Sequence, residues 1–132
     1  MIDHTGINVS DFQLSRTFYT KALAPLGYSI CLELESGAGF GAGPGARDDP
    51  GGDFWISAGE PQIPRVHLAF RAANEEEVNE FYRAALEAGG TDNGAPGERP
   101  HYHPGYYAAF VLDPDGHNIE AVFHGEKRPI AR

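Results

Sequence analysis

The chain has 132 residues, of which 41% are hydrophobic, and it carries a net charge of −9. These values predict one globular domain with a substantial core, built either as a whole or as two intertwined halves. A nucleic-acid partner is not expected, because neutralising phosphate requires clustered Lys and Arg. The sequence has no apolar stretch of about 18 residues and no secretory signal at its start, so we expect no membrane partner.

The single cysteine, Cys31, excludes an intramolecular disulfide framework and favours a reducing, cytoplasmic location. It lies within the segment Tyr28-Ser-Ile-Cys-Leu-Glu-Leu34. In such a segment a small buried core residue is more common than a catalytic thiol. We therefore expect Cys31 to be buried.

The first half of the chain contains a predicted strand, a helix and further strands. Residues 2–9 alternate weakly and are typical of a strand. Ser10 and Gln13 match a capping box, which predicts Ser10 as the N-cap of a helix that ends at Pro25 and Gly27. Three segments follow: a strand over residues 28–35, a loop over residues 37–53 that leaves room for a short strand, and a strand over residues 54–56.

The second half repeats this order. Residues 64–71 are a predicted strand, and Asn74 is a predicted helix N-cap. The acidic residues 75–77 suit the positive end of that helix better than a metal site. Gly89 and Gly90 end the helix.

Near the end of the chain, two strands are joined at Asp113-Pro-Asp-Gly116. Proline fixes φ, glycine allows a positive φ, and the aspartates can accept hydrogen bonds from nearby backbone N–H groups, so a tight reversal is predicted. Side chains alternate along the returning strand. Glu120 therefore faces away from Ile119 and Phe123.

The two halves align without a gap at an offset of 63 residues. The pairs that align are His4 with His67, Phe18-Tyr19 with Phe81-Tyr82, Ala22-Leu23 with Ala85-Leu86, and Gly27 with Gly90. Such a repeat predicts an α+β fold in which two β-α-β-β-β modules, residues 1–60 and 64–126, pair into a curved mixed sheet that encloses a cleft. We expect both modules to belong to one domain over residues 1–132.

A candidate metal site follows from this repeat. His4 and His67 occupy equivalent positions on the first strands of the two modules, and alternation turns His67 and Glu120 away from the helices. Each histidine alone is more often structural or exposed. Two imidazoles and one carboxylate converging in a cleft, however, form an arrangement that holds a divalent transition metal and leaves positions open for substrate.

Residues 99–107 form a second cluster, with two histidines and three tyrosines. They either line the mouth of a pocket or form a packed aromatic loop with surface histidines. Tyr107 and His103 are the candidates here for proton transfer. A second metal site from His101 and His103 is a further alternative, although no third ligand is evident. His117 and His124 are expected at the surface, with a pocket role left open for His124.

The sequence resembles the vicinal oxygen chelate superfamily, which contains glyoxalase I, extradiol dioxygenases, fosfomycin-resistance enzymes and bleomycin-binding proteins. The resemblance is carried by residues 4–11 with Phe18-Tyr19, by residues 66–70, and by residues 109–120 with the Asp-Pro-Asp-Gly hairpin. It implies a glyoxalase-like fold, a metal at the base of the cleft and a homodimer. It also implies that the metal ligands are His4, His67 and Glu120.

The resemblance further implies a metal-dependent enzyme, either a lyase or isomerase of the lactoylglutathione lyase kind or a dioxygenase. Its Ni, Zn, Mn or Fe ion would act as a Lewis acid on a small substrate chelated through adjacent oxygens. The candidate catalytic residues are Glu120, Tyr107 and His103. Glyoxalase I usually supplies a fourth ligand, and that position falls on or near Ser57, so three ligands fit a dioxygenase-like or fosfomycin-resistance-like site better. The alternative is a metal-free binding protein of the bleomycin-resistance type.

Overall fold

The computed structural model describes residues 1–42 and 50–125. Its helices are α1 (Phe12–Leu23) and α2 (Glu75–Glu87), with the short 3-10 helix η1 (Ala24–Leu26) after α1. Its strands are β1 (Thr5–Val9), β2 (Tyr28–Leu34), β3 (Gly37–Ala42), β4 (Phe54–Ala58), β5 (His67–Arg71), β6 (Thr91–Asp92), β7 (Gly97–Glu98), β8 (Tyr107–Leu112) and β9 (Asn118–Phe123). No helix within the described ranges is long and apolar enough to cross a membrane.

The strands form two mixed sheets with the same internal order. One sheet runs β1-β4-β3-β2, and the other runs β5-β9-β8-β6 with β7 also on β8. In each sheet the first strand of the half pairs in parallel with its last strand, β1 with β4 and β5 with β9. The remaining pairs are antiparallel. This confirms the predicted α+β fold and its β-α-β-β-β order.

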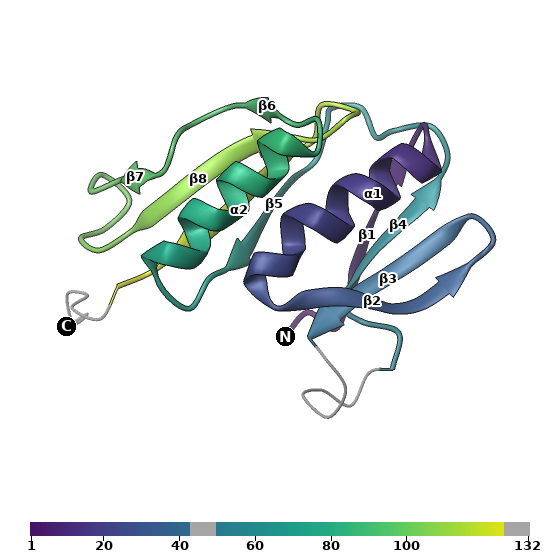
Figure 1. Ribbon diagram of the computed structural model, residues 1–132, viewed down its shortest axis with the longest axis horizontal. Coiled ribbons are helices and arrows are strands. Elements are labelled where there is room, and N and C mark those ends of the chain that lie inside the picture. Colours follow the sequence, from purple (N-terminus) through teal and green to yellow (C-terminus); the bar gives the residue numbers. More distant parts are fainter. Residues whose placement is uncertain (43–49, 126–132) are drawn as a thin grey trace.

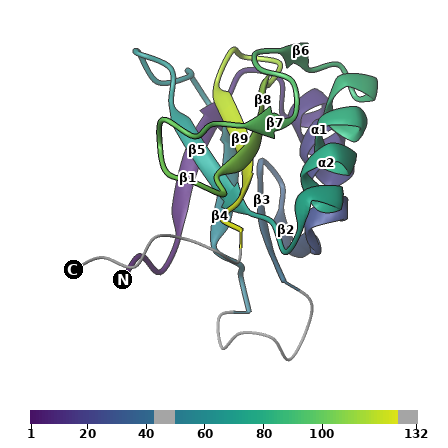
Figure 2. The same ribbon diagram turned by 90° about the vertical axis from the view of Figure 1, so that its left-hand side faces the viewer.

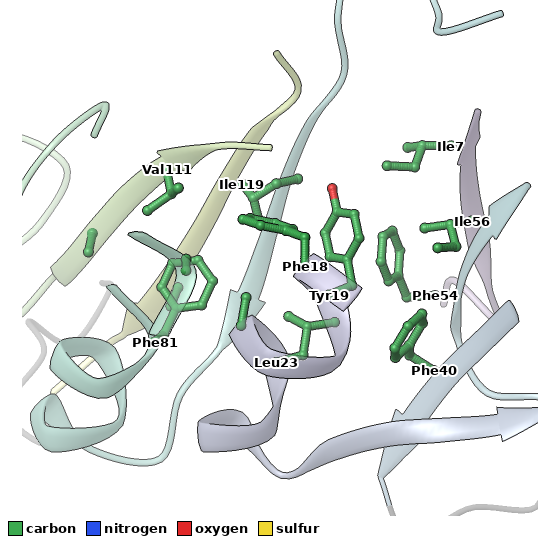
Figure 3. Packing of buried hydrophobic residues seen from close by; sticks show 14 of the residues in the cluster. Ile7, Phe18, Tyr19, Leu23, Phe40, Phe54, Ile56, Phe81, Val111 and Ile119 are labelled. Carbon is green, nitrogen blue, oxygen red and sulfur yellow. The ribbon is translucent and has the colours of Figure 1, made fainter. Parts of the chain in front are cut away.

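Both helices lie on the same side of the sheets, where α1 and α2 pack side by side (Figures 1 and 2). A single core fills the space between helices and strands and draws residues from both halves of the chain (Figure 3). Its largest members are Phe18, Tyr19, Phe40, Phe54 and Phe81. The other side of each sheet is left without a covering helix (Figure 2), and we call these sides the open faces.

Two predictions about local structure need correction. The N-cap of α1 is Asp11, whose side chain accepts a hydrogen bond from the Leu14 N–H, and not Ser10. Ser10 is engaged elsewhere, because both its N–H and its hydroxyl donate to Asp115. Cys31 is exposed rather than buried, because Tyr28 and Ile30 pack against the core and the alternation of β2 turns Cys31 to the other side.

Other local predictions are confirmed. Asn74 caps α2 by accepting from the Glu77 N–H, and Gly27 closes the first helical segment with a φ of 85°. The segment expected to be mainly a loop contains the strand β3, and its residues 43–49 lie outside the described ranges. The turn after β8 is tightly organised: Asp113 Oδ1 accepts from the N–H groups of Asp115 and His117.

The two halves are joined by buried polar contacts around this turn. The Tyr19 hydroxyl donates to Asp113 at 2.5 Å, and burial, followed by the charge of Asp113, raises the pKa of Tyr19 well above its usual value. His117, expected at the surface, is in fact fully buried. Its Nδ1 accepts from the Val66 N–H and its Nε2 donates to the Asn8 carbonyl of β1. The imidazole thus connects the β1 edge to the second half of the chain.

Candidate metal and substrate site

The strands β5 and β9 place His67 and Glu120 next to each other on one open face. In their parallel register, His67 lies opposite Asn118 and Ala69 lies opposite Glu120. Alternation turns Leu68 toward the core and leaves His67 exposed. Glu120 is buried on this face, with 2% of its surface exposed. A buried carboxylate requires a cation or hydrogen-bond donors, so its neighbours decide what the site can do.

The hydrogen bonds of His67 fix where its proton lies. Its Nδ1 is 3.1 Å from the Asn118 carbonyl oxygen, which can only accept, so Nδ1 carries the hydrogen. In the neutral imidazole Nε2 then presents a lone pair, and this atom lies 3.1 Å from Glu120 Oε1. Two lone pairs at that distance repel each other unless a proton or a metal cation lies between them.

The positions of these two atoms fit a metal ion. Metal–ligand bonds of about 2.1 Å, at angles of about 90–109°, put neighbouring donor atoms about 3.0–3.4 Å apart. The distance between His67 Nε2 and Glu120 Oε1, 3.1 Å, falls in this range. Metal-binding histidines usually donate their other ring N–H to a carbonyl or carboxylate, as His67 Nδ1 does here.

The second oxygen of Glu120 is held by Tyr106, whose hydroxyl donates to Oε2. Burial, followed by the hydrogen bond to Glu120, raises the pKa of Tyr106 above its usual value, so the hydroxyl remains a proton donor at neutral pH. The catalytic tyrosine predicted from the sequence was Tyr107, and Tyr106 was not among the candidates. Strand alternation could have identified Tyr106. Phe110 pairs with Glu120, and residue 106 lies an even number of positions from Phe110, so it shares the face of both.

The other predicted catalytic residues lie elsewhere. The hydroxyl of Tyr107 donates to Asn79 of α2 at 2.8 Å, on the helix side of the sheet. His103 Nε2 lies 3.0 Å from His124 Nδ1, and both rings make edge contacts with Tyr106. His101 is exposed. The loop therefore packs its rings around Tyr106, and His103 and His124 border the site through this tyrosine.

The third predicted ligand is not part of this group within one chain. Within residues 1–42 and 50–125, no three His, Cys, Asp or Glu side chains are placed to hold a metal together. His4 precedes β1 and lies next to Asp3, with its Nδ1 2.6 Å from Oδ1. Ser57, on the open face of the other sheet, is exposed and pairs with Asn8. The structure thus brings together His67 and Glu120 and leaves His4 apart from them.

A family model described as the Glyoxalase/Bleomycin resistance protein/Dioxygenase superfamily matches residues 1–121. The chain belongs to this superfamily. No curated protein matches it.

Solved structures of this superfamily share the fold. A glyoxalase/bleomycin resistance protein from Albidiferax ferrireducens is 27% identical, with a TM-score of 0.74, and the match covers 92% of this chain and 96% of that one. A lactoylglutathione lyase from Agrobacterium tumefaciens is 17% identical, with a TM-score of 0.66 and coverage of 93% and 92%. An enzyme of the superfamily from Burkholderia phytofirmans is 20% identical, with a TM-score of 0.68 and coverage of 93% and 98%. The last two show the fold alone.

Removing the Tyr106 hydroxyl tests its hold on Glu120. We expect Tyr106→Phe to weaken binding of a divalent metal by about 10–100-fold, because outer hydrogen bonds orient a ligating carboxylate. The measurement is a calorimetric titration of the metal-free protein with Zn²⁺. Tyr102→Phe is the matched control, since Tyr102 lies in the same loop and is exposed. Equal affinities of the two variants would show that the hydroxyl does not position Glu120.

Proposed function

We propose that the protein is a metal-dependent enzyme of the glyoxalase/dioxygenase type that acts on a small substrate chelated through adjacent oxygens. The observation that carries this proposal is the pair formed by His67 Nε2 and Glu120 Oε1, 3.1 Å apart with the imidazole proton on the far nitrogen. Membership of the superfamily supports it. The metal remains one of Ni, Zn, Mn or Fe, since His and Glu suit several first-row ions.

The bound metal would supply Lewis-acid stabilisation of an enolate- or alkoxide-like charge on the substrate. The residues of this chain have distinct parts in such a reaction. His67 and Glu120 would hold the metal. Tyr106 keeps one Glu120 oxygen engaged through its hydroxyl, which leaves the other oxygen directed at the site. The cytoplasmic location stays a prediction.

The third ligand, in our proposal, comes from a second copy of this chain. Both helices lie on the same side of the sheets (Figures 1 and 2), and among the described residues of one chain no third His, Cys, Asp or Glu joins His67 and Glu120. In a two-fold dimer, the same contacts occur twice. His4 of one copy would then complete the site that His67 and Glu120 of the other begin, and the protein would be a homodimer.

Two reactions and one binding role remain distinct candidates. A lyase or isomerase reaction relies on a fourth ligand in glyoxalase I, and the equivalent position here is Ser57, so the three-ligand set favours an oxygen-dependent reaction. A metal-free binding protein is the alternative class. The position of His67 Nε2 beside Glu120 Oε1 favours the metal-dependent class. A cleft that binds an apolar ligand does not require such a pair.

Metal analysis separates these classes. Protein purified from minimal medium without oxygen is expected to bind about one divalent ion per chain and to melt about 5–10 °C higher with saturating metal, because a ligand that binds the native state stabilises it. Oxygen uptake with catechols would identify a dioxygenase, and turnover of methylglyoxal–thiol adducts would identify a lyase. Protein that binds no metal and gains no thermal stability from Ni²⁺, Zn²⁺, Mn²⁺ or Fe²⁺ would contradict the metal-dependent enzyme and favour the binding role.

A further inference from the structure

Arg71, at the end of β5, is a cation without a partner on the same face as the candidate metal site. The other arginines of the described ranges, Arg16, Arg65, Arg83 and Arg99, each donate to a carboxylate or a carbonyl. Within those ranges the side chain of Arg71 makes no hydrogen bond or ion pair, and the residue is exposed. In a protein with a net charge of −9, an unpaired arginine is readily available to an anionic ligand.

Arg71 borders two cavities. One, of about 260 Å³, lies between the start of β1 and β5, and the other charged groups among its described lining residues are Asp3 and Asp53. Both aspartates have other partners, because Asp3 lies against His4 and Asp53 accepts from the Tyr28 hydroxyl. The second cavity, of about 280 Å³, is lined by Arg71 and His124. Among the described residues that line these two cavities, Arg71 is the only Lys or Arg.

The position of Arg71 relative to the metal ligands follows from the strand. His67, Ala69 and Arg71 alternate onto one face and are all exposed, and Ala69 pairs with Glu120. Four residues of strand put the Cα atoms of His67 and Arg71 about 13 Å apart. Ala69 lies between them, and its small side chain leaves space for a ligand above the strand. A ligand on the order of 10 Å long can therefore contact the metal ligands and Arg71 together.

We propose that Arg71 binds a carboxylate at the far end of the substrate whose adjacent oxygens lie at His67 and Glu120. The substrate class is then a small acid with a chelating oxygen pair at one end and a carboxylate at the other. A guanidinium group matches a carboxylate with two parallel N–H···O bonds. A phosphate ester fits less well, because no second lysine or arginine lies beside Arg71 among the described residues of either cavity. This inference rests on the proposed function.

A matched pair of probes tests it on the Zn²⁺-loaded protein, since Zn²⁺ does not support redox chemistry. The probes are 4-ethylcatechol and 3-(3,4-dihydroxyphenyl)propionate, which share the oxygen pair and differ by a carboxylate. We expect calorimetry to give the acid an affinity about tenfold or more above that of 4-ethylcatechol. Arg71→Gln should remove this preference and Arg71→Lys should retain part of it. Arg83→Gln, which deletes the same charge on α2, should leave it unchanged.

The outcomes separate this inference from the proposed function. If 4-ethylcatechol binds but the acid has no advantage, or keeps its advantage in Arg71→Gln, the role of Arg71 is overturned and metal chelation stands. If only the acid binds, in a way that Arg71→Gln abolishes with or without Zn²⁺, the role of Arg71 stands and chelation fails. If neither probe binds the wild-type protein, both are overturned.

Discussion

Replacing Glu120 by alanine is expected to abolish stoichiometric binding of a divalent metal while the chain still folds. The substitution removes the one carboxylate that lies beside His67 Nε2 within the described ranges. Loss of a ligand from a three-ligand set should reduce the affinity by far more than the loss of an outer hydrogen bond, about 10–100-fold, which sets the lower limit. Metal content after gel filtration and a Zn²⁺ titration measure the effect, and circular dichroism checks the fold.

Two further variants show whether the charge or the volume matters. Glu120→Gln keeps the size of the buried side chain and an acceptor for the Tyr106 hydroxyl, and it should still lose metal binding. Ser57→Ala changes the equivalent position of the first module and should bind metal like the wild type. Undiminished metal binding in Glu120→Ala would refute the site.

The same variant can reveal whether the site is shared between subunits. His4→Ala and Glu120→Ala should each bind metal poorly alone. If His4 acts across the dimer, a mixed dimer of these two variants contains one intact site and one doubly altered site. Random re-pairing of equal amounts should then restore about a quarter of the wild-type metal content. No recovery in verified mixed dimers would place His4 outside the shared site.

Replacing His117 by alanine is expected to lower the free energy of unfolding by about 3–5 kcal/mol, because it leaves two buried backbone groups without partners and creates a cavity. The groups are the Val66 N–H and the Asn8 carbonyl. Such a loss is a large share of the stability of a typical domain, about 5–15 kcal/mol.

Urea unfolding followed by tyrosine and tryptophan fluorescence measures the difference. His101→Ala is the matched control, since His101 is exposed, and should change the free energy of unfolding by about 0.5 kcal/mol or less. A comparable midpoint for the two variants would show that His117 does not join the halves of the chain.

Local signals predicted most of the fold. The cap at Asn74 and the turn at residues 113–116 depend on neighbours within a few residues, and both formed as expected. Two predictions failed for different reasons. Ser10 is not the N-cap because Asp115, far along the chain, accepts from its N–H and its hydroxyl. Cys31 is exposed because Tyr28 and Ile30 take the core side of β2, so that alternation turns Cys31 outward whatever its chemical type.

For the candidate site as well, the part that depends on one module could be predicted from the sequence. The proximity of His67 and Glu120 follows from alternation and from parallel pairing of the first and last strands of a module. The separation of His4 does not follow, because it depends on how the two modules pack their helices. The position of Tyr106 beside Glu120 could have been predicted, because the face on which it lies follows from the hairpin register. Chemical type alone does not distinguish it from its neighbour Tyr107.

The polar contacts around residues 113–117 have a consequence for how the protein is made. The carbonyl on the outer edge of β1 and the hydroxyl of Tyr19 both depend on residues near the C-terminal end of the chain, His117 and Asp113. During translation these partners are synthesised 109 and 94 residues after the groups that they bind. The Tyr19 hydroxyl and the carbonyl on the edge of β1 therefore have no hydrogen-bond partner in the protein until the hairpin of β8 and β9 has been synthesised. The two halves repeat the same order of elements, but the first cannot complete its buried polar contacts before the second has been synthesised.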